Sequence, residues 1–578
     1  MNSDPQIIVL DAGGQYCHLI ARKVRELGVY AETRPSETCA SELSAAKGII
    51  ISGGPSSVYD AGSPTVDPAI FARQQPVLGI CYGQQLMAHL LGGHVRKGDK
   101  GEYGLATLEL DSRTDPLFSG LAGQQQIWMS HRDAVASVPE GFTVAGRTAT
   151  CEVAAMAAPQ RNLYAVQFHP EVVHTTRGRE LLHNFVLRVC GCVPDWDSQH
   201  RAVRLEEEIR EYASGRKVFF FVSGGVDSSV AFALCVRALG EGRVRGAYVD
   251  TGLMREGETE SIARLPGISV EHAEQQFLGA LAGVTDPEEK RHVIGEEFVR
   301  VQERVIEACR LEEEDWILGQ GTIYPDTIES GGTAKASLIK THHNRVAGIQ
   351  KLLDAGRVLE PLKSLYKDEV RAVGRELGLS GELLDRHPFP GPGLAIRCLC
   401  SRCDAPVRVG SDGWVIPVHS VGVQGDERSY AAVLAIERLD HEAGTELINR
   451  LSGVNRVVGV VSLRAPLHAM SVRACSLTST RIERLRKADA IVRRLCHNAG
   501  FDGQVWQFPV ILIPLGMNGT PDSIVLRPVE SVDGMTARSA PMPQPLLEQI
   551  AGQLLALEGI AGVFHDLTHK PPGTIEWE

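Results

Sequence analysis

The stretch from Lys217 to Leu239, KVFFFVSGGVDSSVAFALCVRAL, decides the fold of this chain's central third. Val218 to Val222 form an apolar run of strand length, Ser223 to Gly225 supply a turn, and an apolar segment of helical length follows. A glycine-rich loop between a buried strand and a helix aims backbone N–H groups at an anion. The stretch therefore predicts an α/β domain with an anion site at the end of a strand.

This loop does not have the Gly-Lys-Ser/Thr ending of a Walker A loop. Serine and aspartate in that place suit a site that grips pyrophosphate with amides and hydroxyls, and Asp227 could bind Mg²⁺. SGGVDSS directly after a strand resembles the PP-loop of the ATP pyrophosphatases, which cleave ATP between the α and β phosphates. The resemblance implies ATP binding at Ser223, Gly224, Gly225, Val226, Asp227, Ser228, Ser229 and, beside the adenine in the next strand, Val249 with Asp250.

Two later segments, GQGTIYPDTIES and LIKTHHN, are similar to parts that close over the reacting phosphate in glutamine-dependent members of that family. The resemblance implies metal and phosphate contacts from Asp326, Glu329, Lys340, His342 and His343. Lys340 is the natural charge clamp on the phosphates. The two histidines could equally be a solvated pair on a loop. Some longer relatives carry arginine at the place of Tyr324, so no nucleotide-binding role is assigned there.

Upstream, VLGICYGQQ (Val77 to Gln85) runs from an apolar strand through a glycine-flanked cysteine into a helix, which is the pattern of a nucleophile elbow. The helix N-terminus favours the thiolate form of Cys81. VQFHPEV supplies His169 and Glu171, which project to the same side of an extended segment. His169 can therefore face Cys81 while Glu171 fixes the imidazole tautomer.

The segment SGGPSSVYD places Gly53 and Gly54 after another strand, where their N–H groups and that of Tyr82 could form an oxyanion hole. A cysteine alone is more often a buried structural thiol, but this set resembles the class I glutamine amidotransferases from about residue 6 to 190. The resemblance implies that Cys81 attacks the glutamine carboxamide, forms a glutamyl thioester and releases ammonia. It also implies that Gln85 and the SHRD segment, Ser130 to Asp133, hold the glutamine.

The C-terminal HKPPGTIEWE has two prolines that fix an extended conformation and is predicted to be docked. With HPFPGPGLAIR and SVGVQGD it resembles the glutamine-hydrolysing GMP synthetases, and this resemblance covers nearly the whole chain. It implies amination of xanthosine 5'-monophosphate (XMP) through an adenylyl-XMP intermediate, giving GMP, AMP, pyrophosphate and glutamate. The implied XMP contacts are Asp426, Gln507, Lys570 and Glu576, with Arg527 nearby.

These motifs predict three parts: a flavodoxin-like amidotransferase domain (1–195), a doubly wound PP-loop domain (196–397) and an α+β domain (398–578). The last is predicted to hold two tandem copies, about 398–470 and 471–578. The basis is that VIPVHSVGVQGDERSY and GVNRVVGVV are echoed by PVILIPLGMNGTPDSIVLRPVESVDGMTA and GIAGVFHDL. Coincidence between two generic patterns is the alternative. A tandem pair could pack against itself, so we expect a monomer or at most a weak homodimer.

Composition sets limits on these readings. The 578 residues are 43% hydrophobic and 22% charged with a net charge of −12, which argues against nucleic acid as the main partner. The longest apolar runs have strand length, so no membrane span is expected. The N-terminus lacks a signal-peptide pattern, and thirteen cysteines do not suit a disulfide framework, which together predict a cytosolic protein with reduced thiols. Cys398, Cys400 and Cys403 lack a paired knuckle, so we expect no zinc there.

Two other functions could use some of the same motifs. A PP-loop ligase that acts on a nicotinic acid dinucleotide would share the loop but should lack both the Cys81, His169, Glu171 set and KPPGTIEWE. A glutamine- or nucleotide-sensing regulator on an inactive scaffold should have lost a reactive position, and each of them is present. The sequence therefore favours an enzyme that uses glutamine, ATP, Mg²⁺ and XMP.

Overall fold

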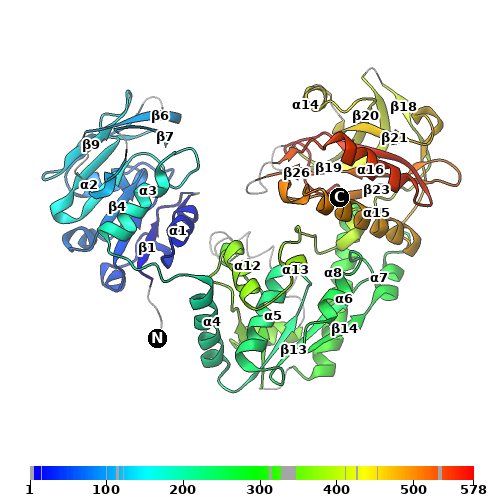
Figure 1. Ribbon diagram of the computed structural model, residues 1–578, viewed down its shortest axis with the longest axis horizontal. Helices are drawn as coiled ribbons and strands as arrows, with labels where there is room; N and C mark the ends of the chain where they lie inside the picture. Colours follow the sequence, from blue (N-terminus) through cyan, green and yellow to red (C-terminus); the bar gives the residue numbers. More distant parts are fainter. Residues whose placement is uncertain are drawn as a thin grey trace. The chain divides into compact units, whose positions relative to one another are not determined.

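The computed structural model describes residues 5–14, 16–98, 101–111, 116–121, 123–311, 315–326, 347–410, 412–424, 427–451, 453–531 and 537–578. The chain forms two compact units, Met1–Arg201 and Ala202–Glu578 (Figure 1). The division lies within helix α4 (Ser198–Ala213), a few residues beyond the predicted end of the first domain. Each unit has buried cores of its own.

The first unit is built on a nine-stranded sheet with the order β2-β1-β3-β4-β11-β10-β9-β6-β7. Its strands are β1 (Ile7–Asp11), β2 (Ala31–Pro35), β3 (Gly48–Ile51), β4 (Val77–Ile80), β6 (Glu102–Leu110), β7 (Gln124–His131), β9 (Thr143–Arg147), β10 (Ala155–Ala158) and β11 (Leu163–Val166). The first five strands of that order are parallel, as in a flavodoxin-like sheet, and the other four extend it in antiparallel fashion. Strands β5 (His94–Arg96) and β8 (Ala134–Ser137) form a separate pair.

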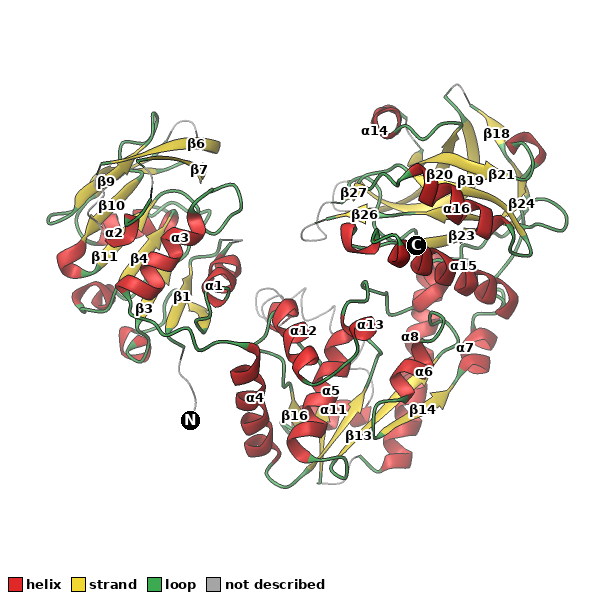
Figure 2. Ribbon diagram, in the orientation of Figure 1, coloured by secondary structure: helices red, strands yellow, loops and turns green. Residues whose placement is uncertain are grey.

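Helices cover both faces of this parallel sheet (Figure 2). They are α1 (Cys17–Arg25), α2 (Tyr82–Leu90) and α3 (Gly178–His183). Along β1, Ile7 and Val9 join one buried cluster with α1, whereas Ile8 and Leu10 join a second cluster with α2. Successive residues of a strand point to opposite faces, so a continuous apolar run such as this one is buried on both sides.

The second unit begins with a five-stranded parallel sheet in the order β14-β13-β12-β15-β16. Its strands are β12 (Lys217–Phe221), β13 (Val244–Asp250), β14 (Ile268–His272), β15 (Trp316–Gly319) and β16 (Val358–Leu359), and its helices are α5 (Val226–Leu239), α6 (Glu258–Ala263), α7 (Glu274–Ala280), α8 (Pro287–Cys309), α11 (Ala347–Asp354), α12 (Lys367–Glu376) and α13 (Gly381–Leu384). Phe219 packs into the cluster that contains α8, and Phe220 meets Phe232 of α5 on the other face. The predicted doubly wound domain is confirmed.

The remaining residues form a seven-stranded sheet, β18-β19-β20-β21-β28-β25-β23. Its elements are β18 (Arg408–Val409), β19 (Trp414–Gln424), β20 (Glu427–Ile436), α14 (His441–Arg450), β21 (Val454–Leu463), α15 (Ser479–Asn498), β23 (Val510–Ile513), β25 (Asp522–Leu526), α16 (Gln544–Leu555) and β28 (Ile560–Asp566). Small sheets join β17 (Ala405–Pro406), β22 (Ser471–Val472) and β24 (Leu515–Gly516), and β26 (Val529–Glu530) with β27 (Arg538–Ser539). The predicted α+β character is confirmed.

This sheet has two halves with the same connectivity. In one, β19 and β20 are antiparallel and α14 leads to β21, which is parallel to β20. In the other, β23 and β25 are antiparallel and α16 leads to β28, which is parallel to β25. The halves meet through the antiparallel pair β21 and β28. A duplication would produce this arrangement, but the tandem origin itself stays a prediction.

One apolar core joins the PP-loop sheet to the C-terminal elements. It contains Phe219 of β12, Val301 of α8 and Leu485 of α15, and also Cys398, which follows the predicted boundary. The predicted boundary at 397/398 thus falls inside a shared core, and the two predicted domains of this unit are packed together.

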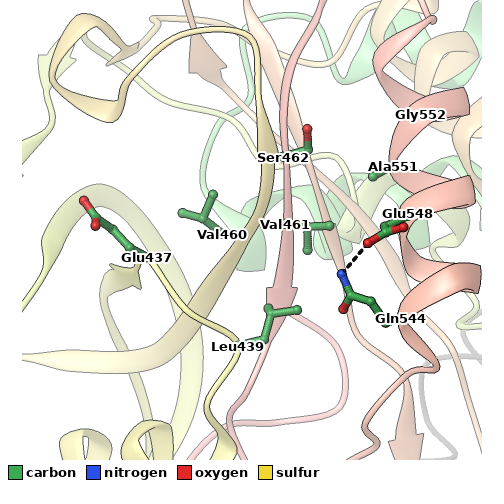
Figure 3. Close-up of a pocket in the computed structure, with 9 residues that line it drawn as sticks. All are labelled: Glu437, Leu439, Val460, Val461, Ser462, Gln544, Glu548, Ala551 and Gly552. Carbon is green, nitrogen blue, oxygen red and sulfur yellow. Dashed lines mark hydrogen bonds between the residues drawn. The ribbon is translucent and has the colours of Figure 1, made fainter.

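A pocket of about 500 Å³ lies between β21 and α16 (Figure 3). It is lined by Glu437, Leu439, Val460, Val461, Ser462, Gln544, Glu548, Ala551 and Gly552, and Gln544 donates a 2.8 Å hydrogen bond to Glu548. None of these is a predicted site residue. Within the described ranges, no helix is both long and apolar enough to cross a membrane.

Candidate active sites

Cys81 lies at the turn between β4 and α2 and has a φ of 52°, which is unusual for a residue other than glycine. The neighbouring glycines are sterically required. A Cβ at Gly79 would lie 2.5 Å from the Gly83 carbonyl oxygen, and a Cβ at Gly83 would lie 2.4 Å from the Ile51 carbonyl oxygen. The predicted strand, sharp turn and helix are therefore present, with Cys81 at the helix N-terminus.

His169 follows β11 and contacts both of its predicted partners. Its Nδ1 lies 2.6 Å from Glu171 Oε1, and its ring is hydrogen-bonded to the Cys81 sulfur. Burial opposes protonation, but Glu171 and Cys81 together outweigh it and hold the pKa of His169 well above its ordinary value. A protonated imidazole beside a sulfur nucleophile is suited to protonate a departing amine.

The loop after β3 lies against Cys81 and His169. A Cβ at Gly53 would lie 3.0 Å from His169 Cε1 and 3.4 Å from Cys81 Cβ, and one at Gly54 would lie 2.3 Å from the Ala12 carbonyl oxygen. Tyr82 is the first residue of α2, so its N–H has no acceptor within the helix. Gly53 and Tyr82 thus lie next to Cys81, Gly54 follows Gly53 in the chain, and the role of the three as an oxyanion hole remains a prediction.

Gln85 is buried and contacts protein groups. Its Nε2 donates to the Asp133 carbonyl oxygen at 2.6 Å and to Gln167 Oε1 at 3.2 Å. Ser57 Oγ donates to Asp133 Oδ2 at 2.5 Å. The Cys81 thiol donates a hydrogen bond to the Ser130 carbonyl oxygen, with 3.6 Å between sulfur and oxygen. Gln85 therefore supports the SHRD segment, while direct contact between these residues and glutamine stays a prediction.

The PP-loop is closed by its own hydroxyl groups. Ser223 Oγ and Ser228 Oγ lie 3.0 Å apart, Gly225 N donates to Ser223 Oγ at 3.3 Å, and Ser228 Oγ donates to the Gly225 carbonyl oxygen at 3.1 Å. Gly224 has a φ of 80°. Val226 to Ser229 form the first turn of α5, in which Ser229 N donates to the Gly225 carbonyl oxygen at 3.1 Å. The backbone N–H groups that precede Ser229 at this helix end favour an anion.

This loop lies where the sheet order reverses. β12 pairs with β13 on one side and with β15 on the other, and ligands of open α/β sheets bind at such a switch point. A Cβ at Gly321, just after β15, would lie 2.8 Å from Ser228 N. Arg386 donates to the Gly224 carbonyl oxygen at 3.3 Å. Close backbone approach and one guanidinium thus fix the loop from two sides.

Lys367, at the start of α12, is a site residue that the sequence reasoning missed. Its Nζ lies 2.7 and 2.6 Å from the two carboxylate oxygens of Asp227, in the first turn of α5. The two residues are far apart in the chain. In the sequence, Lys367 is recognisable only as a lysine at the start of a helix. That position does not identify Asp227 as its partner.

Other predicted ATP and lid residues are only partly placed. Val249 is buried in β13, and Asp250 Oδ1 accepts from Gly252 N at 3.0 Å. Asp326 Oδ2 accepts from Ile323 N at 3.0 Å and so caps its own turn. Tyr324 makes an edge contact with Tyr366 at 5.2 Å between ring centroids. Four other predicted lid residues lie outside the described residues: Glu329, Lys340, His342 and His343.

Among the predicted XMP residues, Gln507 and Glu576 meet directly. Gln507 Nε2 donates to Glu576 Oε1 and to the Pro388 carbonyl oxygen, each at 3.1 Å. Arg397, fully buried, donates to both oxygens of Glu576 at 2.9 and 2.6 Å. The main chain of Lys570 pairs with Ala537 through bonds of 3.2 and 2.7 Å. Asp426 lies outside the described residues.

The C-terminal segment is docked, as predicted. Trp577 is fully buried and its Nε1 donates to Asp566 Oδ2 at 2.8 Å. Arg527 donates to the carbonyl oxygens of Ile575, Thr568 and Thr574 and lies 2.7 Å from Asp566. Arg527, placed near the nucleotide by resemblance, is thus a buried clamp on this segment.

The buried side chains of Arg456, Arg527 and Asp566 hold the C-terminal segment in place. Arg456 lies 3.1 Å from Asp566 and donates to Thr574 Oγ1 and the Glu576 carbonyl oxygen at 2.9 and 2.8 Å. Burial raises the cost of ionising Asp566, but Arg527 and Arg456 outweigh it and lower its pKa. The position of Glu576 therefore depends on this buried network as well as on Arg397.

Comparisons with known proteins agree with all three parts. The family models for Glutamine amidotransferase class-I, NAD synthase and GMP synthase C terminal domain match residues 8–189, 198–266 and 495–577. A Symbiobacterium thermophilum protein named GMP synthase [glutamine-hydrolyzing] is 42% identical over 588 residues, covering 99% of both chains. A Thermobifida fusca protein of the same name is 42% identical over 595 residues, covering 99% of this chain and 98% of its own. With near-complete coverage at this identity, the chain belongs to the family of glutamine-hydrolysing GMP synthases.

Proposed function

We propose that this enzyme makes GMP by releasing ammonia from glutamine at Cys81 and using it to aminate XMP that ATP has adenylylated at the PP-loop. One observation carries the proposal: a single chain holds a Cys81, His169, Glu171 contact set and an anion-binding loop at a sheet switch point. A glutaminase alone would not need the second feature. A nucleotide-activating enzyme supplied with free ammonia would not need the first.

At the first site the Cys81 sulfur attacks the carboxamide carbon of glutamine. Gly53, Gly54 and Tyr82 would donate N–H groups to the oxygen that becomes negative, and His169 would pass its proton to the leaving nitrogen. The C–N bond breaks, ammonia leaves and a glutamyl thioester remains. Water activated by the now neutral His169 releases glutamate. Glu171 holds the ring in position throughout.

At the second site the C2 oxygen of XMP is a poor leaving group until it is joined to AMP. The PP-loop amides and the Ser223 and Ser228 hydroxyls would hold the pyrophosphate, and Val249 would lie beside the adenine. Lys367 would offset phosphate charge near Asp227, as Lys340 was expected to do. The C2 oxygen attacks the α-phosphorus of ATP, the bond to the β-phosphate breaks and pyrophosphate leaves. Ammonia then attacks C2 of the adenylyl-XMP, and AMP leaves with the former C2 oxygen.

Asp227 is suited to hold Mg²⁺ brought in with ATP. Mg²⁺ commonly takes one or two carboxylates together with substrate phosphates and waters, and Asp227 offers one carboxylate at the N-terminus of α5. When bound, the ion would offset negative charge on the phosphates. The described part of the chain holds no cluster of three or more metal-ligating side chains, so substrate oxygens would complete the coordination.

XMP is assigned to the region where Gln507 and Glu576 meet, with Lys570 and Asp426 as further contacts. Arg397 fixes the Glu576 carboxylate, so the carboxylate is presented in one orientation. This supports recognition of a purine edge with N–H donors. A ligase for a nicotinic acid dinucleotide remains the second candidate, because the model for NAD synthase matches residues 198–266, but it explains neither the amidotransferase unit nor the C-terminal segment.

The antiparallel pairing of β21 with β28 supports a monomeric enzyme, and the cytosol remains its expected location. Each of these strands closes the edge that its half of the sheet would otherwise present to a second chain. Sedimentation as a tight dimer at nanomolar concentration would contradict the monomer.

Product analysis tests the function. With ATP, Mg²⁺ and ammonium, we expect AMP, pyrophosphate and GMP in equal amounts only when XMP is present. AMP release that needs a nicotinate dinucleotide, or that proceeds equally well without XMP, would overturn the proposal.

A further inference from the structure

Two cysteines that the proposed reaction does not use lie side by side in the second unit. Ser401 and Cys475 form an antiparallel bridge, with Ser401 N donating to Cys475 O at 3.2 Å and Cys475 N donating to Ser401 O at 2.8 Å. This pairing places Cys475 next to Cys400, the residue before Ser401. The fold thus brings together two cysteines that are 75 positions apart in the sequence.

Cations surround the Cys400 sulfur. Arg481 of α15 directs a guanidinium nitrogen at it over 3.8 Å. Lys290 of α8 is fully buried, with its Nζ 3.1 Å from the Cys398 carbonyl oxygen and 2.6 Å from Glu578, and its charge lowers the pKa of the Cys400 thiol. Cys400 Sγ also lies 3.6 Å from the Cys398 carbonyl oxygen.

The pKa values of the two thiols are shifted in opposite directions. The hydrogen bond from Cys475 and the charges of Lys290 and Arg481 outweigh burial and lower the pKa of Cys400, whereas the shared proton raises the pKa of Cys475. Both residues are half-buried rather than fully enclosed. Cys398, fully buried beside them, has its pKa raised to about 12 by burial. A partly exposed thiolate in a cationic site is the setting of a reactive cysteine.

We propose that Cys400 and Cys475 form a redox-active dithiol that reacts with hydroperoxides, with Cys400 as the attacking thiolate and Cys475 as the resolving thiol. The Cys400 sulfur attacks one peroxide oxygen, the O–O bond breaks, and the leaving oxygen takes a proton to give water or an alcohol. The Cys475 sulfur then attacks the Cys400 sulfenic acid, and the S–O bond breaks. The hydroxyl leaves as water with the Cys475 proton. Two thiols are oxidised to one disulfide and one peroxide is reduced.

The test treats the whole protein with hydrogen peroxide, blocks remaining thiols, and maps the peptides by mass before and after reduction with dithiothreitol. We expect a peptide pair linked between Cys400 and Cys475 that disappears on reduction. In Cys475→Ser the resolving thiol is absent, so Cys400 should accumulate as sulfenic acid and be trapped by dimedone. Cys400→Ser should leave Cys475 unoxidised.

Matched controls separate this chemistry from general thiol oxidation. Cys403→Ser removes an exposed thiol of the same segment and should leave the link unchanged. Cys190 and Cys192 form a second neighbouring pair in the first unit, but Cys192 is only 7% exposed and should react later. Thermal unfolding of each variant verifies that it is folded. A link from Cys400 to Cys398 or Cys403, or absence of dimedone adduct on Cys400 in folded Cys475→Ser, would overturn the proposal.

Discussion

Lys367 and Asp227 face each other at the PP-loop, with Nζ 2.6 and 2.7 Å from the two carboxylate oxygens. Both side chains are partly exposed, so the pair adds little to stability. In the proposed reaction the pair would place a positive charge where phosphates bind. Local motifs were sufficient to predict Cys81, His169 and Glu171, because each lies within a few residues of its own signal. Lys367 could not be predicted, because its contact with α5 exists only after the sheet has folded.

Replacement of Lys367 by alanine should therefore affect the synthetase reaction alone. We expect GMP formation from glutamine and from ammonium to fall by about 10² or more, as when one preorganised charge donor is removed from a transition state. Glutaminase activity at Cys81 should be near wild type. Lys363→Ala, an exposed lysine in the same connection, is the matched control. Unchanged synthesis in Lys367→Ala, measured by GMP formation, would remove this residue from the phosphate site.

At the scale of elements, the strand, glycine turn and helix units were predictable because each is coded by consecutive residues. The antiparallel extension of the first sheet was not, since β6, β7, β9 and β10 carry no signal for which strand each one joins. The same limit applies to β21 and β28: their pairing places Arg456 against Asp566, which are 110 positions apart. The buried contacts of Arg456 and Asp566 that support the C-terminal segment depend on this strand pairing, so the sequence could not predict them.

Strand β28 also carries a pH-sensitive group, His565. Burial, together with nearby His441 and Arg527, lowers the pKa of His565 to about 4, against 6.5 in an unfolded chain. As pH falls below 6.5 the unfolded chain binds a proton that the folded chain refuses, so the free energy of unfolding decreases. The loss from this residue is roughly 3 kcal/mol between pH 6.5 and 4.

Denaturant unfolding at pH 7 and pH 4.5 measures this effect. His565→Gln should lose less stability on acidification than the wild type, by about 2 kcal/mol. His497→Gln, at an exposed histidine of α15, should behave like the wild type.

Glu578, whose pKa burial raises to about 7, contributes to the pH dependence with the opposite sign, because the folded chain holds its proton more tightly than the unfolded chain does. The comparison of variant with wild type cancels that contribution. Equal acid sensitivity of His565→Gln and the wild type would contradict the assignment.

At the scale of the whole molecule, the chain separates two chemistries into two compact units, Met1–Arg201 and Ala202–Glu578. The predicted order of functions along the chain matches this division, since the cysteine elbow lies in the first unit and the PP-loop in the second. The third predicted part, from residue 398 on, shares a core with the PP-loop sheet, so the second and third predicted parts are one folded body. The sequence suggested a boundary between these two parts. Residues of α8 and α15 join one buried cluster only in the folded chain, and no local sequence pattern shows this.

In the proposed reaction, ammonia made at Cys81 is used at the PP-loop of the same chain. The most direct test of this is the rate of GMP formation by Cys81→Ala, measured once with glutamine and once with ammonium salt as the nitrogen source. The glutamine-driven rate should fall by about 10³ or more, because removal of a nucleophile abolishes the thioester route. The ammonium-driven rate should stay near that of the wild type. Loss of both rates in a folded variant, or retention of the glutamine-driven rate, would contradict the account.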